Sequence, residues 1–187
     1  MIKQTIKYLL IKIGLRKPDR ISMIKKNGGK IGKNVFLGSG TLIDYDLAFL
    51  LDIKDNVVIA SNSIIELHDS SIPNVLNKGK LRVGRIIIKE NAYLGVACTI
   101  LPGVVIGEGS LIGANSLVNK SIPAGEVWAG VPVKYICKVS ELVEKRKNEK
   151  NKLIYDIDWI GESSKKEIDY SKFKRIMIEN VRKHFNK

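Results

Sequence analysis

The sequence predicts an all-β core that winds as a parallel β-helix of about four coils, with a protruding loop and helices at both ends. Three observations carry this prediction: an aliphatic residue recurs every six positions, short residues stand at fixed places between them, and only two insertions interrupt the repeat. A period of six fits neither the 3.6-residue turn of an α-helix nor the two-residue alternation of a plain strand. It fits short strands joined by tight bends, three to a coil, with neighbouring coils about 4.8 Å apart.

The repeated aliphatic residues fall into four groups of three, and each group makes one coil. They are Ile31, Leu37 and Ile43; Ile53, Ile59 and Ile65; Ile88, Leu94 and Ile100; and Ile106, Ile112 and Val118. Each of these side chains is expected to point into the coil and to stack on its equivalent in the next coil. The short residues are expected at the corners, where the backbone turns. The spacing does not determine the handedness.

The two insertions both follow the third strand of a coil. Four extra residues separate Ile43 from Ile53, and seventeen separate Ile65 from Ile88. The longer insertion predicts a loop over residues 69–87, and His68 stands where this loop leaves the coil. Long loops on a regular scaffold commonly carry function. One coil back from His68 lies Asp46, so the register predicts that these two side chains meet.

The charge of the chain lies in its flanks. The 187 residues carry a formal net charge of +13, divided as +8 in residues 1–30, zero in residues 31–137 and +5 in residues 138–187. A nucleic-acid-binding protein usually carries its basic stripe on the folded body, interleaved with aromatic residues. Because this body is neutral and its few aromatic residues are scattered, no nucleic-acid partner is expected.

The sequence favours a cytoplasmic protein, with the inner face of the membrane as the alternative location. No apolar run approaches the roughly 18 residues that a transmembrane helix needs. The basic N-terminus lacks the cleavage site of a signal peptide. Cys98 and Cys137 do not make a disulfide framework.

The flanks predict helices outside the coil domain of residues 31–137. Residues 1–30 form a basic segment in which the apolar residues of 2–13 have helical spacing. We expect this segment to cap the open end of the β-helix, and peripheral membrane contact is the alternative. Residues 138–187 predict a charged tail with helices near 138–151 and 170–185.

Several motifs resemble a known family. The run Ile106-Gly107-Glu108-Gly109-Ser110-Leu111-Ile112-Gly113-Ala114-Asn115-Ser116-Leu117-Val118 is followed by Ser121-Ile122-Pro123 and by Trp128-Ala129-Gly130-Val131-Pro132-Val133-Lys134. Together they resemble the hexapeptide-repeat acyltransferases over roughly residues 20–137. The resemblance is closest to galactoside- and maltose-type sugar O-acetyltransferases and to capsule or lipopolysaccharide O-acetyltransferases. It implies a left-handed β-helix, a homotrimer with active sites between subunits, and acetyl-CoA as the donor.

His68 is the candidate catalytic residue. Acetyl transfer to a hydroxyl needs a base, and histidine suits this role because its reference pKa is about 6.5. His68 is the one histidine in the predicted coils, since the other, His184, lies in the charged tail. From the residues alone, the favoured interpretation is a corner histidine packed against the loop. The resemblance implies that it is the general base, because the family places that histidine at the root of the loop.

Three aspartates near His68 have open roles. Asp69 either orients the imidazole ring or caps the start of the loop. Asp44 and Asp46 lie where the resemblance implies an acidic residue that binds the acceptor, and the alternative for each is a turn aspartate. We expect one of these two to face the acceptor.

The resemblance also implies a set of residues that bind acetyl-CoA. It places the backbone N–H of Val96 at the developing oxyanion, Ala114 beside the pantetheine arm, and Asn119, Lys120 and Lys134 near the far end of the coenzyme. The alternative for each lysine is a solvated surface charge. In many family members a glycine stands where this chain has Asn115.

Proteins with this repeat also have other functions. The γ-class carbonic anhydrases need three histidines around zinc, so one histidine in the coils excludes that site and no metal is expected. The sequence therefore predicts an acetyl-CoA-dependent O-acetyltransferase that modifies a sugar of a bacterial surface polysaccharide or lipopolysaccharide, with His68 as general base. The alternatives are acetyl transfer to a streptogramin-type antibiotic or to an amino-sugar amine, and then a catalytically inactive structural trimer.

Overall fold

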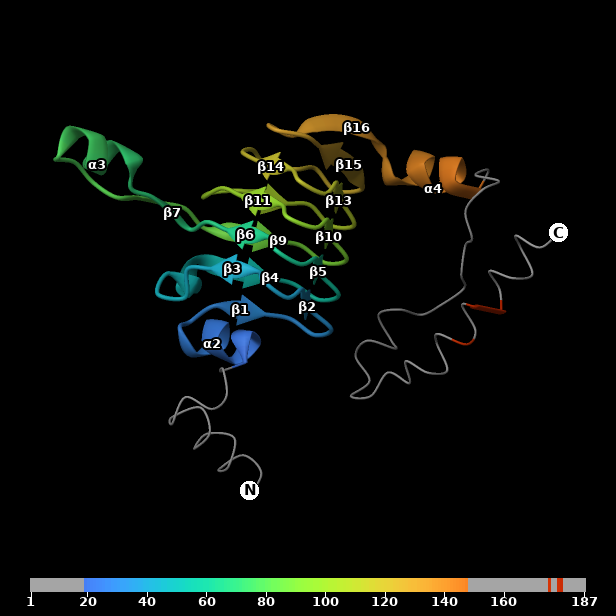
Figure 1. Ribbon diagram of the computed structural model, residues 1–187, viewed down its shortest axis with the longest axis horizontal. Helices are drawn as coiled ribbons and strands as arrows, with labels where there is room; N and C mark the ends of the chain where they lie inside the picture. Colours follow the sequence, from blue (N-terminus) through green and yellow to red (C-terminus); the bar gives the residue numbers. More distant parts are fainter. Residues whose placement is uncertain (1–18, 148–174, 176–177, 180–187) are drawn as a thin grey trace, which may run out of the picture. The chain divides into compact units, whose positions relative to one another are not determined.

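The computed structural model of the protein describes residues 19–147, 175 and 178–179, and its core is a left-handed parallel β-helix whose strands lie in three sheets (Figure 1). The first sheet contains β1 (Lys30–Ile31), β4 (Leu51–Ile53), β9 (Ile86–Ile88) and β12 (Val105–Ile106). The second contains β2 (Phe36–Leu37), β5 (Val58–Ile59), β10 (Tyr93–Leu94), β13 (Leu111–Ile112) and β15 (Glu126–Ala129). The third contains β3 (Leu42–Ile43), β6 (Ile64–Ile65), β11 (Thr99–Ile100) and β14 (Leu117–Val118).

The coil phase predicted from the six-residue period is confirmed by the strand pairing. On each face, the aliphatic residues pair in parallel with their equivalents one coil away. The pairs follow the series Ile31, Ile53, Ile88 and Ile106; Leu37, Ile59, Leu94 and Ile112; and Ile43, Ile65, Ile100 and Val118. Apart from Ile31, which is half-buried, all of these side chains are buried. They form the continuous core of the solenoid.

The corners of the coils explain the short residues between the aliphatic ones. Five corner asparagines, Asn115 among them, adopt the left-handed backbone conformation, which asparagine tolerates better than most residues. Buried hydroxyl groups also recur at the corners. Ser110 and Ser116, for example, donate hydrogen bonds to the carbonyl oxygens of Gly107 and Gly113, at 2.7 and 2.6 Å. These bonds satisfy polar groups that would otherwise be buried without a partner.

The first coil is covered by helix α2 (Arg20–Lys26), which packs against β1 and the 3-10 helix η1 (Ala48–Leu50) (Figure 1). Ile24 of α2 is fully buried in the core. The Arg20 guanidinium donates to the carbonyl oxygens of Gly38 and Leu37, at 2.6 and 2.8 Å. Because β2 is the last strand of its sheet, Arg20 supplies hydrogen bonds that a further coil would have supplied.

The last coil is followed by a partial fifth coil that the sequence analysis did not predict. Ile122 makes a parallel bridge with Ile106, and β15 pairs with β13. Strand β16 (Lys134–Lys138) then folds back antiparallel to β15. The compact unit that contains the coils ends at Val139, and a second unit begins at Ser140.

The described residues include only part of the predicted flanking helices. Helix α4 (Val139–Lys147) lies within the charged helix predicted near 138–151. The N-terminal helix predicted over 2–13 lies outside the described residues, as does nearly all of the helix predicted near 170–185. Within the described part of the chain, no helix is both long enough and apolar enough to span a membrane.

The long insertion forms an arm that extends away from the coils (Figure 1). Strand β7 (His68–Asp69) pairs antiparallel with β8 (Arg82–Val83), and helix α3 (Ser71–Leu76) lies between them. The arm differs from the predicted loop 69–87 at both ends. It already includes His68, and the chain is back in the coil at Ile86, because β9 pairs with β4 from its first residue.

Glycines at the corners provide a test of the coil stacking. A Cβ atom added to Gly107 would lie 2.4 Å from the backbone nitrogen of Ala124 in the next coil, whereas one added to Gly109 would meet nothing within 4 Å. We expect Gly107→Ala to lower the free energy of unfolding by about 1–3 kcal/mol through overpacking. Gly109→Asn should be nearly neutral because asparagine tolerates the positive φ of +58° at this position. Thermal melts followed by circular dichroism measure both, and equal melting temperatures for the two variants would contradict the tight stacking.

Candidate active site

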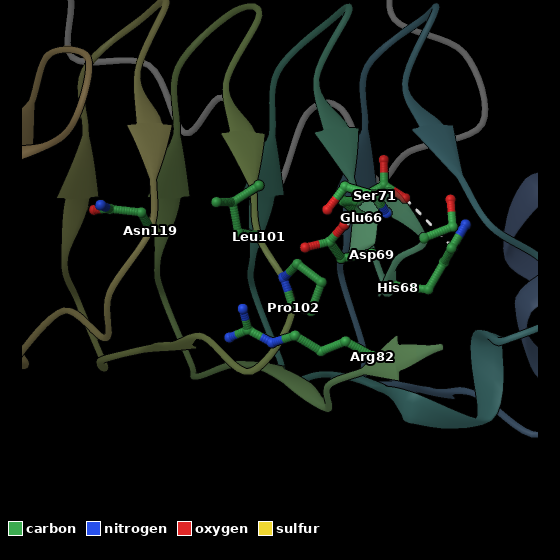
Figure 2. A pocket seen from close by; sticks show the side chains of 9 residues that line it. Glu66, His68, Asp69, Ser71, Arg82, Leu101, Pro102 and Asn119 are labelled. Atoms are coloured by element: carbon green, nitrogen blue, oxygen red, sulfur yellow. Dashed lines mark hydrogen bonds and ion pairs between the residues drawn. The ribbon is translucent and has the colours of Figure 1, made fainter. Parts of the chain in front are cut away.

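A cleft of about 650 Å³ opens where the arm leaves the third sheet (Figure 2). The arm contributes His68, Asp69, Ser70, Ser71 and Arg82 to the lining, and the coils contribute Glu66, Leu101, Pro102 and Asn119. The cleft thus combines an imidazole, two carboxylates, a guanidinium and an amide.

The coil side of the cleft is one edge of the solenoid. Each strand of the third sheet is followed directly by an edge residue, and these residues are Asp44, Glu66, Leu101 and Asn119 in successive coils. Because the preceding strands pair in register, the four residues stack along the edge. This column brings three polar side chains, those of Asp44, Glu66 and Asn119, to the foot of the arm.

His68 is held beside two of these edge residues. Its Nδ1 atom lies 2.9 Å from Oδ2 of Asp44 and 3.4 Å from Oε1 of Glu66, and Figure 2 marks the second contact. Neither contact has hydrogen-bond alignment, and Nδ1 itself is shielded from solvent. A third of the His68 side chain is nevertheless exposed (33%). The exposed part of the side chain therefore lies away from Nδ1.

The predicted meeting of Asp46 and His68 is wrong, because Asp44 is the aspartate at the ring. By a fixed coil offset, Asp46 would lie one coil below His68. The chain leaves the coil path just after Ile43, where the Asp46 backbone N–H turns back to donate to Oδ1 of Asp44, at 3.2 Å. Strand pairing instead puts Asp44 level with Glu66, and His68 reaches over both.

Asp69 is engaged at the start of the arm. Its Oδ1 accepts the backbone N–H of Ser71 at 2.9 Å. The side-chain and backbone hydrogen bonds from Ser71 lower the pKa of Asp69. Among the described residues, the hydrogen bonds of this carboxylate thus go to the arm and not to the His68 ring. The structure favours the capping role over the orienting role.

Val96 and Ala114 lie on another edge, where the second sheet gives way to the third. The backbone N–H of Asn115 donates to the carbonyl oxygen of Val96 at 2.8 Å, so the two corners stack. The Val96 N–H has no hydrogen-bond partner among the described residues, and the same holds for the equivalent corner residues Ser61 and Ala114. Val96 and Ala114 are both exposed. This edge offers free N–H groups beside small side chains.

The residues predicted to bind acetyl-CoA do not all lie together. Lys134 begins β16 and pairs with Ala129, which places it at the Val96 edge. Asn119 lines the His68 cleft, and Lys120 follows it on the same edge. The third sheet separates the two edges, so one chain does not bring His68 and Val96 to one place.

Glu66 and Arg82 both line the cleft, although neither was predicted as a site residue. The coil offset that aligns Ile43 with Ile65 also aligns Asp44 with Glu66, and this signal was available in the sequence. Arg82 could not be found in that way. Its place opposite Asp69 depends on the antiparallel pairing of the arm, which no six-residue period encodes.

Comparison with known proteins agrees with this architecture. Residues 85–120 match the bacterial transferase hexapeptide family (six repeats). The galactoside O-acetyltransferase of Escherichia coli K12 is 34% identical over 138 residues, which cover 71% of this chain and 64% of that protein. The galactoside O-acetyltransferase of Lactococcus lactis is 35% identical over 54% of this chain and 51% of its own length. The chain therefore spans less than two thirds of either relative.

Solved structures show the same fold. A galactoside acetyltransferase in complex with coenzyme A superposes with a TM-score of 0.54 at 26% identity, covering 74% of this chain and 80% of that chain. A hexapeptide-repeat acetyltransferase of Vibrio cholerae, solved with acetyl coenzyme A, gives a TM-score of 0.54 at 19% identity over 70% and 81% of the two chains.

Fold and repeat together define the class, which is that of left-handed β-helix proteins built from hexapeptide repeats. Within this class, the chain is similar to the hexapeptide-repeat transferases, through the match over residues 85–120 and through the relatives above.

The hydrogen bonds at Asp69 predict a change in its titration. Because Ser71 lowers the pKa of Asp69, the carboxylate stays ionised to a lower pH than an isolated aspartate. We expect Ser71→Ala to raise this pKa by removing the side-chain donor while the backbone donor remains. Carboxyl-carbon NMR titration measures the shift, and Ser70→Ala is the matched control because Ser70 is not among the groups that lower it. An unchanged midpoint in Ser71→Ala would contradict the assigned hydrogen bond.

Proposed function

We propose that the protein is an O-acetyltransferase that moves the acetyl group of acetyl-CoA to a sugar hydroxyl, with His68 as general base. The observation that carries the proposal is the state of His68 in the cleft. Its Nδ1 atom is shielded and lies 2.9 Å from Oδ2 of Asp44, while a third of the side chain is exposed at the cleft. The similarity to galactoside O-acetyltransferases supports the donor and the class of acceptor.

The reaction places few demands on the protein. The free nitrogen of His68, Nε2, takes the proton from the acceptor hydroxyl as its oxygen attacks the thioester carbonyl carbon. The bond between carbonyl carbon and sulfur then breaks, and the proton held by His68 passes to the departing thiolate. Asp44 and Glu66 stabilise the imidazolium that exists between the two transfers. The products are the acetyl ester and free coenzyme A.

The Val96 edge has the features that a thioester needs. The unpaired N–H of Val96 is the proposed donor to the oxygen of the carbonyl as negative charge develops on it. Ala114, one coil further on, leaves room for a pantetheine chain to lie against the edge. Lys134 offers an ammonium group to the phosphates of the coenzyme, as does Lys120 at the other edge.

The separation of the two edges supports a homotrimer with its active sites between subunits. Within one chain, His68 and Val96 lie at opposite margins of the third sheet. A site that needs both groups is complete only when the His68 edge of one subunit faces the Val96 edge of its neighbour. Three copies arranged around a threefold axis form three such sites.

The proposed setting is the modification of a bacterial surface polysaccharide or lipopolysaccharide on the cytoplasmic side. This follows the sequence resemblance to enzymes of that kind. The basic N-terminal segment would favour a position near the anionic inner face of the membrane, where lipid-linked glycans are assembled.

Replacement of the base is the first test of this function. We expect His68→Ala to lower the rate of acetyl transfer by about 10²- to 10⁴-fold, because the hydroxyl proton then has no acceptor. Asp44→Asn should also lower the rate, by a smaller factor. The assay measures free thiol released from acetyl-CoA in the presence of a panel of sugars.

Glu108→Gln is the control for the loss of one carboxylate, because Glu108 is exposed at the corner that follows the first sheet. Turnover that is unchanged in His68→Ala would remove His68 from the mechanism. Turnover with an antibiotic or an amino sugar, but with no neutral or acidic sugar, would redirect the proposal to those acceptors.

Mixed trimers test the site between subunits. His68→Ala and Ala114→Trp should each inactivate a pure trimer, the second by blocking the donor edge. When the two variants are co-expressed, random assembly pairs an intact His68 edge with an intact Ala114 edge in about a quarter of the interfaces. We expect about a quarter of wild-type turnover in the mixture. If both groups act within one chain, every site keeps one defect and the mixture stays inactive.

A further inference from the structure

Arg82 is a cation of the cleft that the proposed chemistry does not use. It lies on β8 opposite Asp69 and lines the same cleft as His68. Its guanidinium makes no ion pair and no hydrogen bond with any residue that the structure describes. A guanidinium in a cleft with all its donors free is suited to a ligand with oxygen acceptors.

The other arginine of the arm is in a different state. Arg85 lies 3.0 Å from Oδ2 of Asp52, a buried carboxylate that also contacts Lys54 at 3.1 Å. Arg85 therefore has a structural partner within the fold. Asp69, the residue opposite Arg82, accepts its hydrogen bonds from Ser71 and forms no ion pair with the guanidinium among the described residues, although the charge of Arg82 also lowers the pKa of Asp69.

The two ends of the cleft differ in charge. At one end, Asp44 and Glu66 face the shielded nitrogen of His68. From β8, the Arg82 side chain extends below Pro102, away from His68 and toward the side where Asn119 lies (Figure 2). An acceptor that fills the cleft with its hydroxyl at His68 thus presents another part of itself to Arg82 and Asn119.

We propose that the acceptor is an anionic sugar, whose phosphate or carboxylate group binds to Arg82 while its reacting hydroxyl lies at His68. This inference rests on the proposed function and adds the substrate class to it. Phosphate and carboxylate share the planar pair of oxygens that a guanidinium binds with two parallel hydrogen bonds. Asn119 can donate a further bond through its amide.

The charge of the arm agrees with an anionic ligand. Between His68 and Arg85, the arm carries four basic residues and one acidic residue, whereas residues 31–137 as a whole are neutral. Lys78 and Lys80 are exposed, and within the described residues neither has a partner. A local excess of positive charge raises the concentration of anions near the cleft and speeds their association.

The test compares three ligands with the same ring: methyl galactoside, galactose 1-phosphate and galacturonic acid. Their dissociation constants are measured on the full chain by saturation-transfer NMR without acetyl-CoA, so that the readout does not depend on turnover. We expect at least one anionic sugar to bind about 10- to 100-fold more tightly than the neutral glycoside. Arg82→Gln should remove this preference.

Lys80→Gln is the matched control, because it removes the same charge from the arm at a position outside the cleft lining. It should keep most of the preference, and circular dichroism checks that both variants fold. A preference for the phosphate identifies a glycosyl phosphate as the acceptor class, and a preference for the carboxylate identifies a uronic acid.

Three results would overturn the inference: equal binding of neutral and anionic sugars, a preference that survives Arg82→Gln, or no binding of either anion at millimolar concentration. The proposed function has a separate readout, which is thiol release from acetyl-CoA. Arg82-dependent binding without acetyl transfer would refute the function and keep the anion site. Acetyl transfer to neutral sugars without an anion preference would support the function and refute the anion site.

Discussion

The register between neighbouring coils is the constraint on which the whole structure depends. Each coil buries its aliphatic side chains only against those of the coils above and below, so all coils must present them at the same points. The corners must follow the same register, because Gly107 leaves no room for a side chain beneath Ala124. A slip of one residue would turn the aliphatic side chains outward and bring side chains into these tight corners.

The candidate site arises where this register is interrupted. Both insertions leave the solenoid at the end of the third sheet, after Ile43 and after Ile65. The shorter one departs at Asp44, which stays level with Glu66, and the longer one carries His68 over the same edge. Because the coils beneath remain in register, the two side chains come within 2.9 Å of each other although they are 24 positions apart in the sequence. A regular repeat could not have produced this contact.

Because the site lies where the repeat is interrupted, the sequence could predict some features and not others. The aliphatic columns and the coil phase follow from a local period, so they were predicted residue by residue and confirmed. Whether Asp44 or Asp46 lies beside His68 depends on how the chain turns after Ile43. A fixed coil offset can predict such a pair only where both residues still follow the coil path. The arm has no period, so neither its hairpin nor the position of Arg82 could be derived. The partial fifth coil was missed for a related reason, because the step from Val118 to Ile122 is only four residues, and the six-residue spacing returns only from Ile122 to Trp128.

The Val96 edge and the arm therefore tolerate sequence changes to different degrees. Residues of the Val96 edge belong to the repeat, and they contribute backbone groups and small side chains whose form the stacking dictates. Residues of the arm contribute nothing to the aliphatic columns, and α3 has no buried side chain at all. Substitutions in the arm thus cost the fold little, since surface changes rarely exceed about 0.5 kcal/mol. In the proposed enzyme, recognition of a constant donor fits the constrained edge. Selection of a particular acceptor fits the arm, where a substitution of a residue such as Arg82 would change the lining of the cleft without disturbing the coils.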